Sequence, residues 1–148
     1  MLKAKALVSY GDILIDDSNK VMLKRSGMEL DLGGIAKGYA SSKVKEYLVE
    51  LGVESAIINL GGNIDLIGSK PKGVGWRVGI QHPREDRGKY IGILELNDKS
   101  LVSSGDYERF FIEDGIRYHH ILDVKSGFPR NGEIISASII GSSSIEGE

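Results

Sequence analysis

The stretch from Asp31 to Ala40 reads Asp-Leu-Gly-Gly-Ile-Ala-Lys-Gly-Tyr-Ala and leads directly into the clearest helical pattern of the chain. From Ala40 to Leu51, apolar residues recur at helical spacing with charged residues between them. Gly52 follows, at a position suited to a C-terminal cap. Because Gly33 and Gly34 lack a Cβ atom, the backbone there can turn sharply and approach a ligand closely. The stretch therefore predicts a helix start whose free N–H groups favour an anion such as phosphate.

Lys37 lies in the first turn of this helix, from where its ammonium group can reach a phosphate, and Asp31 stands just before the turn. The Gly-Lys-Ser/Thr order of a Walker P-loop is absent, and so is a G-x-G-x-x-G pattern. A glycine turn leading into a surface helix, with Lys37 in solvent, fits the same residues equally well. On the residues alone, both interpretations stay open.

Short apolar runs between polar turns predict strands along most of the remaining chain. The expected strands cover residues 13–16, 21–24, 55–60, 76–80, 90–96, 100–104, 110–112, 116–122 and 134–140. The strand at 55–60 is expected to be buried and to end at the turn Gly61-Gly62-Asn63, and a polar loop with Arg84 is expected between 76–80 and 90–96. Asp114-Gly115 predicts a hairpin turn, and the polar residues 142–148 predict a frayed end. One strong helix among many strands predicts an α+β fold rather than regular βαβ winding.

The composition restricts the classes of function. A length of 148 residues fits one domain with a core of ordinary size, and 41% apolar and 27% charged residues are typical of a folded globular protein. The net charge of −2, without a basic block, gives no indication of nucleic acid binding. The absence of cysteine excludes disulfides, thiolate metal sites and cysteine nucleophiles.

Polar groups also gather in the blocks Ser103–Glu108 and Tyr118–Asp123. A Ser-His-Asp triad is an alternative hypothesis, with Ser104 as nucleophile, although no G-x-S-x-G elbow is present. The other members of that triad would be one of His119 and His120 and one of Asp106 and Asp123. Such a hydrolase predicts that Ser104→Ala abolishes an esterase activity that Lys37→Ala spares.

The paired histidines and Asp123 also have a purely structural interpretation. Neighbouring residues of a strand point to opposite faces, so His119 and His120 are not expected to bind one metal together. Asp123 can cap the turn that follows it, at residues 125–127.

Five blocks, in this order and spacing, together resemble the ApbE family of flavin transferases, the FAD:protein FMN transferases. They are Asp31–Ala40, Asn59–Gly62, Trp76–Ile80, Ser104–Glu108 and His120–Asp123. The likeness extends over essentially the whole chain. It implies that residues 1–148 form an ApbE-like, T-fold-related α+β domain with a mixed or antiparallel sheet and few helices.

The resemblance implies a Mg²⁺-dependent reaction. The enzyme binds FAD, cleaves its pyrophosphate, transfers FMN to a Thr or Ser hydroxyl of a target flavoprotein and releases AMP. By position, the resemblance implies FAD contacts at Asp31, Lys37, His120 and Leu122, and a main-chain oxygen of Gly34 on the metal. It identifies no catalytic residue. It also implies an exported parent protein, periplasmic or anchored to the membrane as a lipoprotein.

The sequence departs from the family pattern at both ends. Family members continue past the last strand into an Ala-Asp-Ala-x-x-Thr segment, whose Asp and Thr bind the metal. Glu148 falls near that Asp and is the corresponding candidate metal ligand. The family's N-terminal portion has no counterpart, so the sequence is expected to be a fragment or a truncated relative. The alternative function is a catalytically silent FAD-binding or assembly module.

We expect these 148 residues to bind FAD weakly and to transfer little FMN, because half of the family's metal site has no match. Mass spectrometry of a target protein incubated with FAD and Mg²⁺ measures the transfer. A robust Mg²⁺-dependent mass increase of the target would contradict this expectation. FAD binding without release of AMP would favour the silent module.

Overall fold

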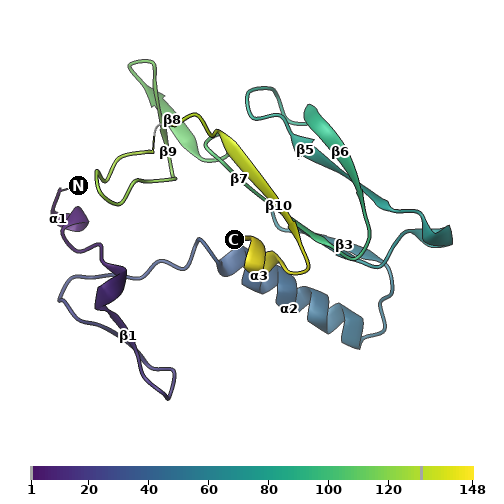
Figure 1. Cartoon of the computed structure of the whole chain (residues 1–148), viewed down its shortest axis with the longest axis horizontal. Coiled ribbons are helices and arrows are strands. Elements are labelled where there is room, and N and C mark those ends of the chain that lie inside the picture. Colours follow the sequence, from purple (N-terminus) through teal and green to yellow (C-terminus); the bar gives the residue numbers. More distant parts are fainter. Residues whose placement is uncertain (1, 131) are drawn as a thin grey trace. The chain divides into compact units, whose positions relative to one another are not determined.

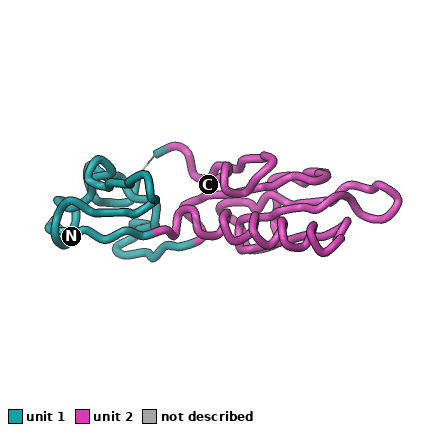
Figure 2. Tube along the Cα trace, turned by 90° about the horizontal axis from the view of Figure 1, so that it is seen from below, with its two compact units in different colours: residues 1–31, 109–132 teal, residues 32–108, 133–148 magenta. Residues whose placement is uncertain are grey.

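The structure, a computed structural model, describes residues 2–130 and 132–148. The chain forms two compact units (Figure 2). Unit 1 comprises Met1–Asp31 and Arg109–Gly132, and unit 2 comprises Leu32–Glu108 and Glu133–Glu148. Among the described residues, no helix is both long and apolar enough to cross a membrane.

Unit 1 contains two short hairpins and little helix. Its elements are α1 (Leu2–Lys5), the 3-10 turn η1 (Tyr10–Asp12), β1 (Ile13–Ile15), β2 (Val21–Leu23), β8 (Phe110–Glu113) and β9 (Ile116–His119). Strand β1 pairs with β2, and β8 pairs with β9, both antiparallel. Asp114 and Gly115 both have positive φ, 50° and 77°, as the predicted hairpin turn requires.

Unit 2 holds the longer elements (Figure 1). They are α2 (Ala36–Glu50), β3 (Ala56–Asn59), β4 (Asn63–Ile67), the 3-10 turn η2 (Pro71–Gly73), β5 (Trp76–Gln81), β6 (Tyr90–Leu96), β7 (Ser100–Gly105), β10 (Ser136–Gly141) and α3 (Ser144–Gly147). Four strands form an antiparallel sheet in the order β10-β7-β4-β3, while β5 and β6 form a separate hairpin. The predicted α+β class with antiparallel sheets and few helices is confirmed.

Strand β4 divides unit 2 into an apolar side and a polar side. Alternate residues of a strand point to opposite faces, so Ile64 and Leu66 share one face. That face forms the core with Leu101 of β7 and with side chains of the β5–β6 hairpin. The alternate residues Asn63 and Asp65 point to the other face, where α2 and α3 contact the sheet. Helices, sheet and hairpin thus form three layers.

Three expectations from the sequence were wrong. Strand β4 was not predicted, although it is the most buried strand of the chain. Residues 142–148 are not frayed, because Ser144 begins α3 and is fully buried. Strand β3 was expected to be buried, but Ile57 is 48% exposed and only Ile58 is covered. The apolar core is also smaller than the chain length suggests, with six buried apolar residues among those described.

Helix α3 packs closely against α2 at Gly38, in the first turn of α2. A Cβ atom there would lie 2.7 Å from the carbonyl oxygen of Ser144 and 2.9 Å from Oε2 of Glu148. Real Cβ atoms do not reach these separations, so only glycine fits while α3 keeps its place. The sequence analysis gave no role to Gly38, yet this glycine is required for the packing of α3 against α2.

We expect Gly38→Ala to lower the free energy of unfolding by about 1–3 kcal/mol, as overpacking does. The expected effect is opposite to the usual one, because Gly→Ala at an open position inside a helix raises the free energy of unfolding by about 1 kcal/mol. Urea denaturation measures the difference. Gly34→Ala is the matched control, since its Cβ would meet nothing within 4 Å. A Gly38→Ala variant as stable as the parent would contradict the close packing of α2 and α3.

Candidate functional site

The first turn of α2 has its cap supplied from far along the chain. Ile35 precedes the helix and offers no side-chain hydrogen bond. The first N–H groups of a helix have no partner within it, and they carry the positive end of its dipole. The N–H of Gly38 donates to Oε2 of Glu148 at 2.9 Å. A carboxylate therefore occupies the place that the sequence predicts for an anion.

The Glu148 carboxylate is held at both of its oxygens. Its Oε1 accepts a hydrogen bond of 3.0 Å from the side-chain amide of Asn63, which is itself 1% exposed. A buried amide donor on one oxygen and a helix N–H on the other fix the orientation of the carboxylate. Each oxygen keeps a further lone pair for another partner.

Lys37 reaches across to the hairpin turn between β3 and β4. Its Nζ donates to the carbonyl oxygen of Gly61 at 3.1 Å. Gly61 and Gly62 have φ of 60° and 97°, a two-residue turn that favours glycine at both positions, and Leu60 and Asn63 flank it. The ammonium group is thus held at the same helix turn that carries Glu148, rather than lying free in solvent.

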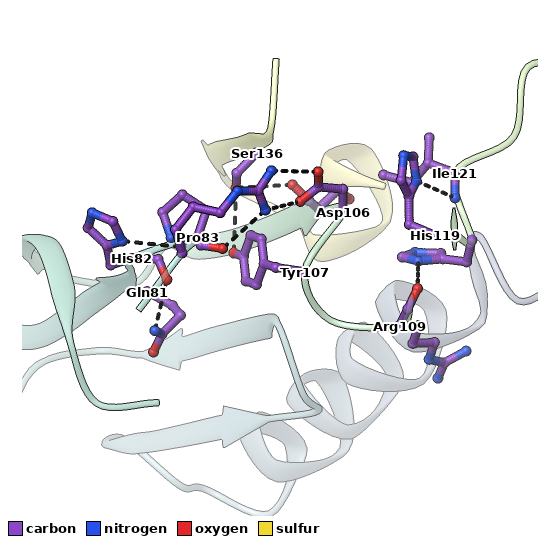
Figure 3. A network of polar contacts seen from close by, with 12 residues as sticks. Gln81, His82, Pro83, Asp106, Tyr107, Arg109, His119, Ile121 and Ser136 are labelled. Atoms are coloured by element: carbon purple, nitrogen blue, oxygen red, sulfur yellow. Dashed lines mark hydrogen bonds and ion pairs between the residues drawn. The ribbon is translucent and has the colours of Figure 1, made fainter. Parts of the chain in front are cut away.

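The Ser104–Glu108 block is tied to the loop after β5 by two ion pairs. The one on Asp106 is drawn in Figure 3. Arg84 donates from both terminal nitrogens to the two oxygens of Asp106, at 2.6 and 2.8 Å. This pairing raises the pKa of Arg84 above its usual value. Arg87 lies 3.3 Å from Glu108 in a more exposed pair. The bidentate pair has the strongest geometry an arginine and a carboxylate can adopt, so it fixes this loop.

The neighbouring histidines His119 and His120 have different surroundings, and His119 is labelled in Figure 3 beside Ile121. His119 is 8% exposed, and its Nδ1 accepts from the N–H of Ile121 at 3.3 Å. His120 is exposed, and its Nδ1 lies 3.3 Å from the carbonyl oxygen of Arg109. The two neighbouring histidines thus differ both in exposure and in hydrogen-bond partner. Leu122 follows them and is 55% exposed.

The hydrolase triad receives no support from its two candidate acids. Asp106 binds Arg84 with both oxygens. Asp123 accepts the backbone N–H groups of Lys125 and Ser126, each at 3.1 Å, and so caps the turn that follows it. The structural interpretation of Asp123 is thereby confirmed.

The residues that the resemblance proposes divide between the two units. Gly34, Lys37 and Glu148 belong to unit 2, whereas Asp31, His120 and Leu122 belong to unit 1. Gly34 is exposed, with open space where a side chain would stand. Within residues 2–130 and 132–148, no three or more His, Cys, Asp or Glu side chains gather as a metal cluster.

Sequence reasoning missed two residues of this region. Asn63 was assigned to a glycine turn, although it begins β4 and binds Glu148. Its signal was the Gly61–Gly62 pair between two apolar runs, which is typical of a hairpin. Arg84 was placed in a polar loop, and nothing in the sequence indicates its pairing with Asp106, 22 residues away.

We expect the Asp123 carboxyl to titrate below its ordinary pKa of about 3.9. The backbone N–H of Lys125 lowers this pKa most, followed by the hydroxyl and N–H of Ser126. Because the folded pKa is the lower one, the capping contribution is present above the ordinary pKa and is lost as pH falls through the folded value. Carboxyl ¹³C NMR measures the titration. Ser126→Ala should move the midpoint upward, and a native midpoint at or above the ordinary value would refute the capping.

Known proteins resemble this chain in sequence and in structure. It is 43% identical over 144 residues to an FAD:protein FMN transferase of Klebsiella pneumoniae, covering 97% of this chain and 44% of that protein. A transferase of the same name from Treponema pallidum is 40% identical over 136 residues, covering 86% and 38%. The crystal structure of the ApbE protein of Thermotoga maritima matches 98% of this chain and 46% of its own, with a TM-score of 0.88 and 35% identity.

The flavin transferase ApbE of Vibrio cholerae aligns with a TM-score of 0.82 and 31% identity, over 97% of this chain and 45% of its own. The chain thus spans less than half the length of these relatives. The model of the ApbE family matches residues 1–148. With the fold, the five blocks and the full-length match in agreement, this chain belongs to the ApbE family.

Proposed function

We propose that this chain provides the pyrophosphate- and metal-handling part of an enzyme that transfers FMN from FAD to a hydroxyl group of a target protein. What supports the proposal most is one observation: a lysine ammonium and a carboxylate are both held at the first turn of α2. Relatives carrying the name FAD:protein FMN transferase agree with it. For Asp31, His120 and Leu122, the proposal rests on the resemblance alone.

The residues present fit a Mg²⁺ ion that retains much of its water. Mg²⁺ is commonly bound by one or two carboxylates together with substrate phosphates, rather than by a full protein cage. Glu148 offers lone pairs on a carboxylate that is already oriented by Asn63 and Gly38. The main-chain oxygen of exposed Gly34 is the second proposed ligand. When bound, the ion would neutralise charge on the pyrophosphate and polarise the bond that breaks.

The chain's own residues then serve binding and orientation. Lys37 carries a positive charge beside the helix start, where it can exchange its contact with Gly61 for a phosphate oxygen. The N-terminal dipole of α2 adds to the attraction for phosphate. A Thr or Ser hydroxyl of the target would attack the FMN phosphorus in line, and AMP would leave. Such a reaction depends on positioning and charge neutralisation more than on a covalent intermediate with the protein.

We expect FAD to bind the chain more tightly with Mg²⁺ than without it. A titration that follows the intrinsic fluorescence of FAD measures the two affinities. Lys37→Ala should weaken binding by about tenfold, as loss of a charged hydrogen bond does. Lys43→Ala is the matched control, because Lys43 pairs with Glu46 on the exposed side of α2. Thermal denaturation of both variants confirms that they fold.

Two results would overturn the proposal. One is equal FAD affinity of the Lys37→Ala and Lys43→Ala variants. The other is an FAD affinity of the parent chain that is the same with and without Mg²⁺. Binding that depends on Mg²⁺ and Lys37 without release of AMP, measured by chromatography, would replace the transferase by a silent FAD-binding module.

A further inference from the structure

A buried carboxylate lies at the centre of unit 2, away from the residues proposed to meet FAD. Asp65 of β4 is 1% exposed. It accepts hydrogen bonds from the hydroxyl groups of three serines, which come from three different elements. Ser100 of β7 donates to Oδ1, whereas Ser41 of α2 and Ser144 of α3 both donate to Oδ2, the latter at 2.6 Å. The three serines are themselves 0–1% exposed.

The three serines that donate to Asp65 differ in whether the sheet also fixes their position. Ser100 stands directly opposite Asp65 in the β4–β7 ladder, so the sheet already fixes its position. Ser41 and Ser144 come from helices, whose backbone makes no ladder with the sheet. A single carboxylate oxygen therefore joins α2 and α3 to β4 and to each other.

The same two helices meet again about one turn away, at the candidate site. Ser41 lies three residues after Gly38 and four after Lys37, which places all three on one face of α2. Glu148 lies four residues after Ser144. The junction at Asp65 and the contact between Gly38 and Glu148 thus belong to one interface of α2 with α3. A shift of either helix at Asp65 would move the Glu148 carboxylate away from the first turn of α2.

We infer that Asp65 is a positioning residue. By accepting from Ser41 and Ser144 on one oxygen, it sets the register of α3 against α2 and so places the Glu148 carboxylate at the helix start beside Lys37. Its effect on FAD rests on the proposed function, whereas its effect on the Gly38–Glu148 contact does not. Asp65 itself acts only through the two helices.

Deleting single hydroxyl groups tests this inference without removing the buried acid. Ser41→Ala, Ser144→Ala and Ser100→Ala each remove one donor from the same carboxylate, and Ser100→Ala is the matched control. The readout is hydrogen exchange of the Gly38 amide by NMR, since this amide donates to Glu148. The amide of Leu66, which bonds the carbonyl oxygen of Lys99 at 2.9 Å, reports opening of the sheet in the same samples.

We expect Ser41→Ala and Ser144→Ala to speed Gly38 exchange by about tenfold relative to Leu66, the effect of one lost buried hydrogen bond. Ser100→Ala should leave that ratio unchanged within about threefold. Asp65→Asn should also retain the ratio, because its amide oxygen can accept from both helices while its NH₂ group donates to Ser100. Across the variants, a faster exchange of the Gly38 amide relative to the Leu66 amide should be accompanied by a weaker Mg²⁺-dependent affinity for FAD. The melting temperature should not correlate with this affinity.

The inference is overturned if Ser41→Ala and Ser144→Ala change the ratio no more than Ser100→Ala does. It is also overturned if Asp65→Asn loses the protection of Gly38. Failure of the proposed function looks different: the parent chain would not bind FAD at all, while the exchange ratios would still respond to Ser41→Ala and Ser144→Ala. A chain that binds FAD with equal affinity in all variants, despite changed exchange, would refute the link from Asp65 to the ligand.

Discussion

The start of α2 depends on an acceptor that lies 110 residues further along the chain. Ile35 offers no side-chain cap, and although the N–H of Ala36 donates to the carbonyl oxygen of Leu32, the N–H of Gly38 needs an acceptor from elsewhere. The Glu148 carboxylate accepts from the N–H of Gly38 and places a negative charge at the positive end of the helix dipole, and the glycine at position 38 lets α3 come close enough. Lys37, on the same helix turn, is held by the carbonyl oxygen of Gly61, and the proposed handling of a pyrophosphate and its metal depends on this ammonium group together with the fixed carboxylate.

Beneath this contact, unit 2 places polar groups in an interior position that usually holds apolar side chains. One face of β4 packs apolar residues against the β5–β6 hairpin, and the other buries Asp65 and Asn63 under two helices. Burying such groups is tolerated only when their hydrogen bonds are made. Because those bonds are directional, they specify one arrangement of α2, α3 and sheet more sharply than apolar packing does.

Much of this fold could be predicted from the sequence, because hydrophobic periodicity and turn residues are local signals. The helix, the Asp114-Gly115 hairpin and most strands followed from them. Strand β4 was missed because Asp65 interrupts its apolar run. The serine hydroxyl groups that satisfy the buried Asp65 carboxylate are distant in sequence, so no local pattern indicates them. The terminal helix α3 was missed although Ser143 caps it locally, because its buried contacts, Ser144 to Asp65 and Glu148 to Gly38 and Asn63, come from distant elements. Asp31 and Lys37 were indicated by the glycine-rich helix start and the other candidate site residues by the resemblance, whereas the contacts of Glu148 required the structure.

The proposed function requires that the pyrophosphate of FAD, rather than its flavin ring alone, binds at the start of α2. The ³¹P NMR spectrum of FAD tests this most directly, because each phosphorus reports on its own surroundings. With the chain added in the presence of Mg²⁺, both phosphorus resonances should shift or broaden, and the change should diminish when Mg²⁺ is removed. Quenching of flavin fluorescence with unchanged phosphorus resonances would show that FAD binds elsewhere and would contradict the account.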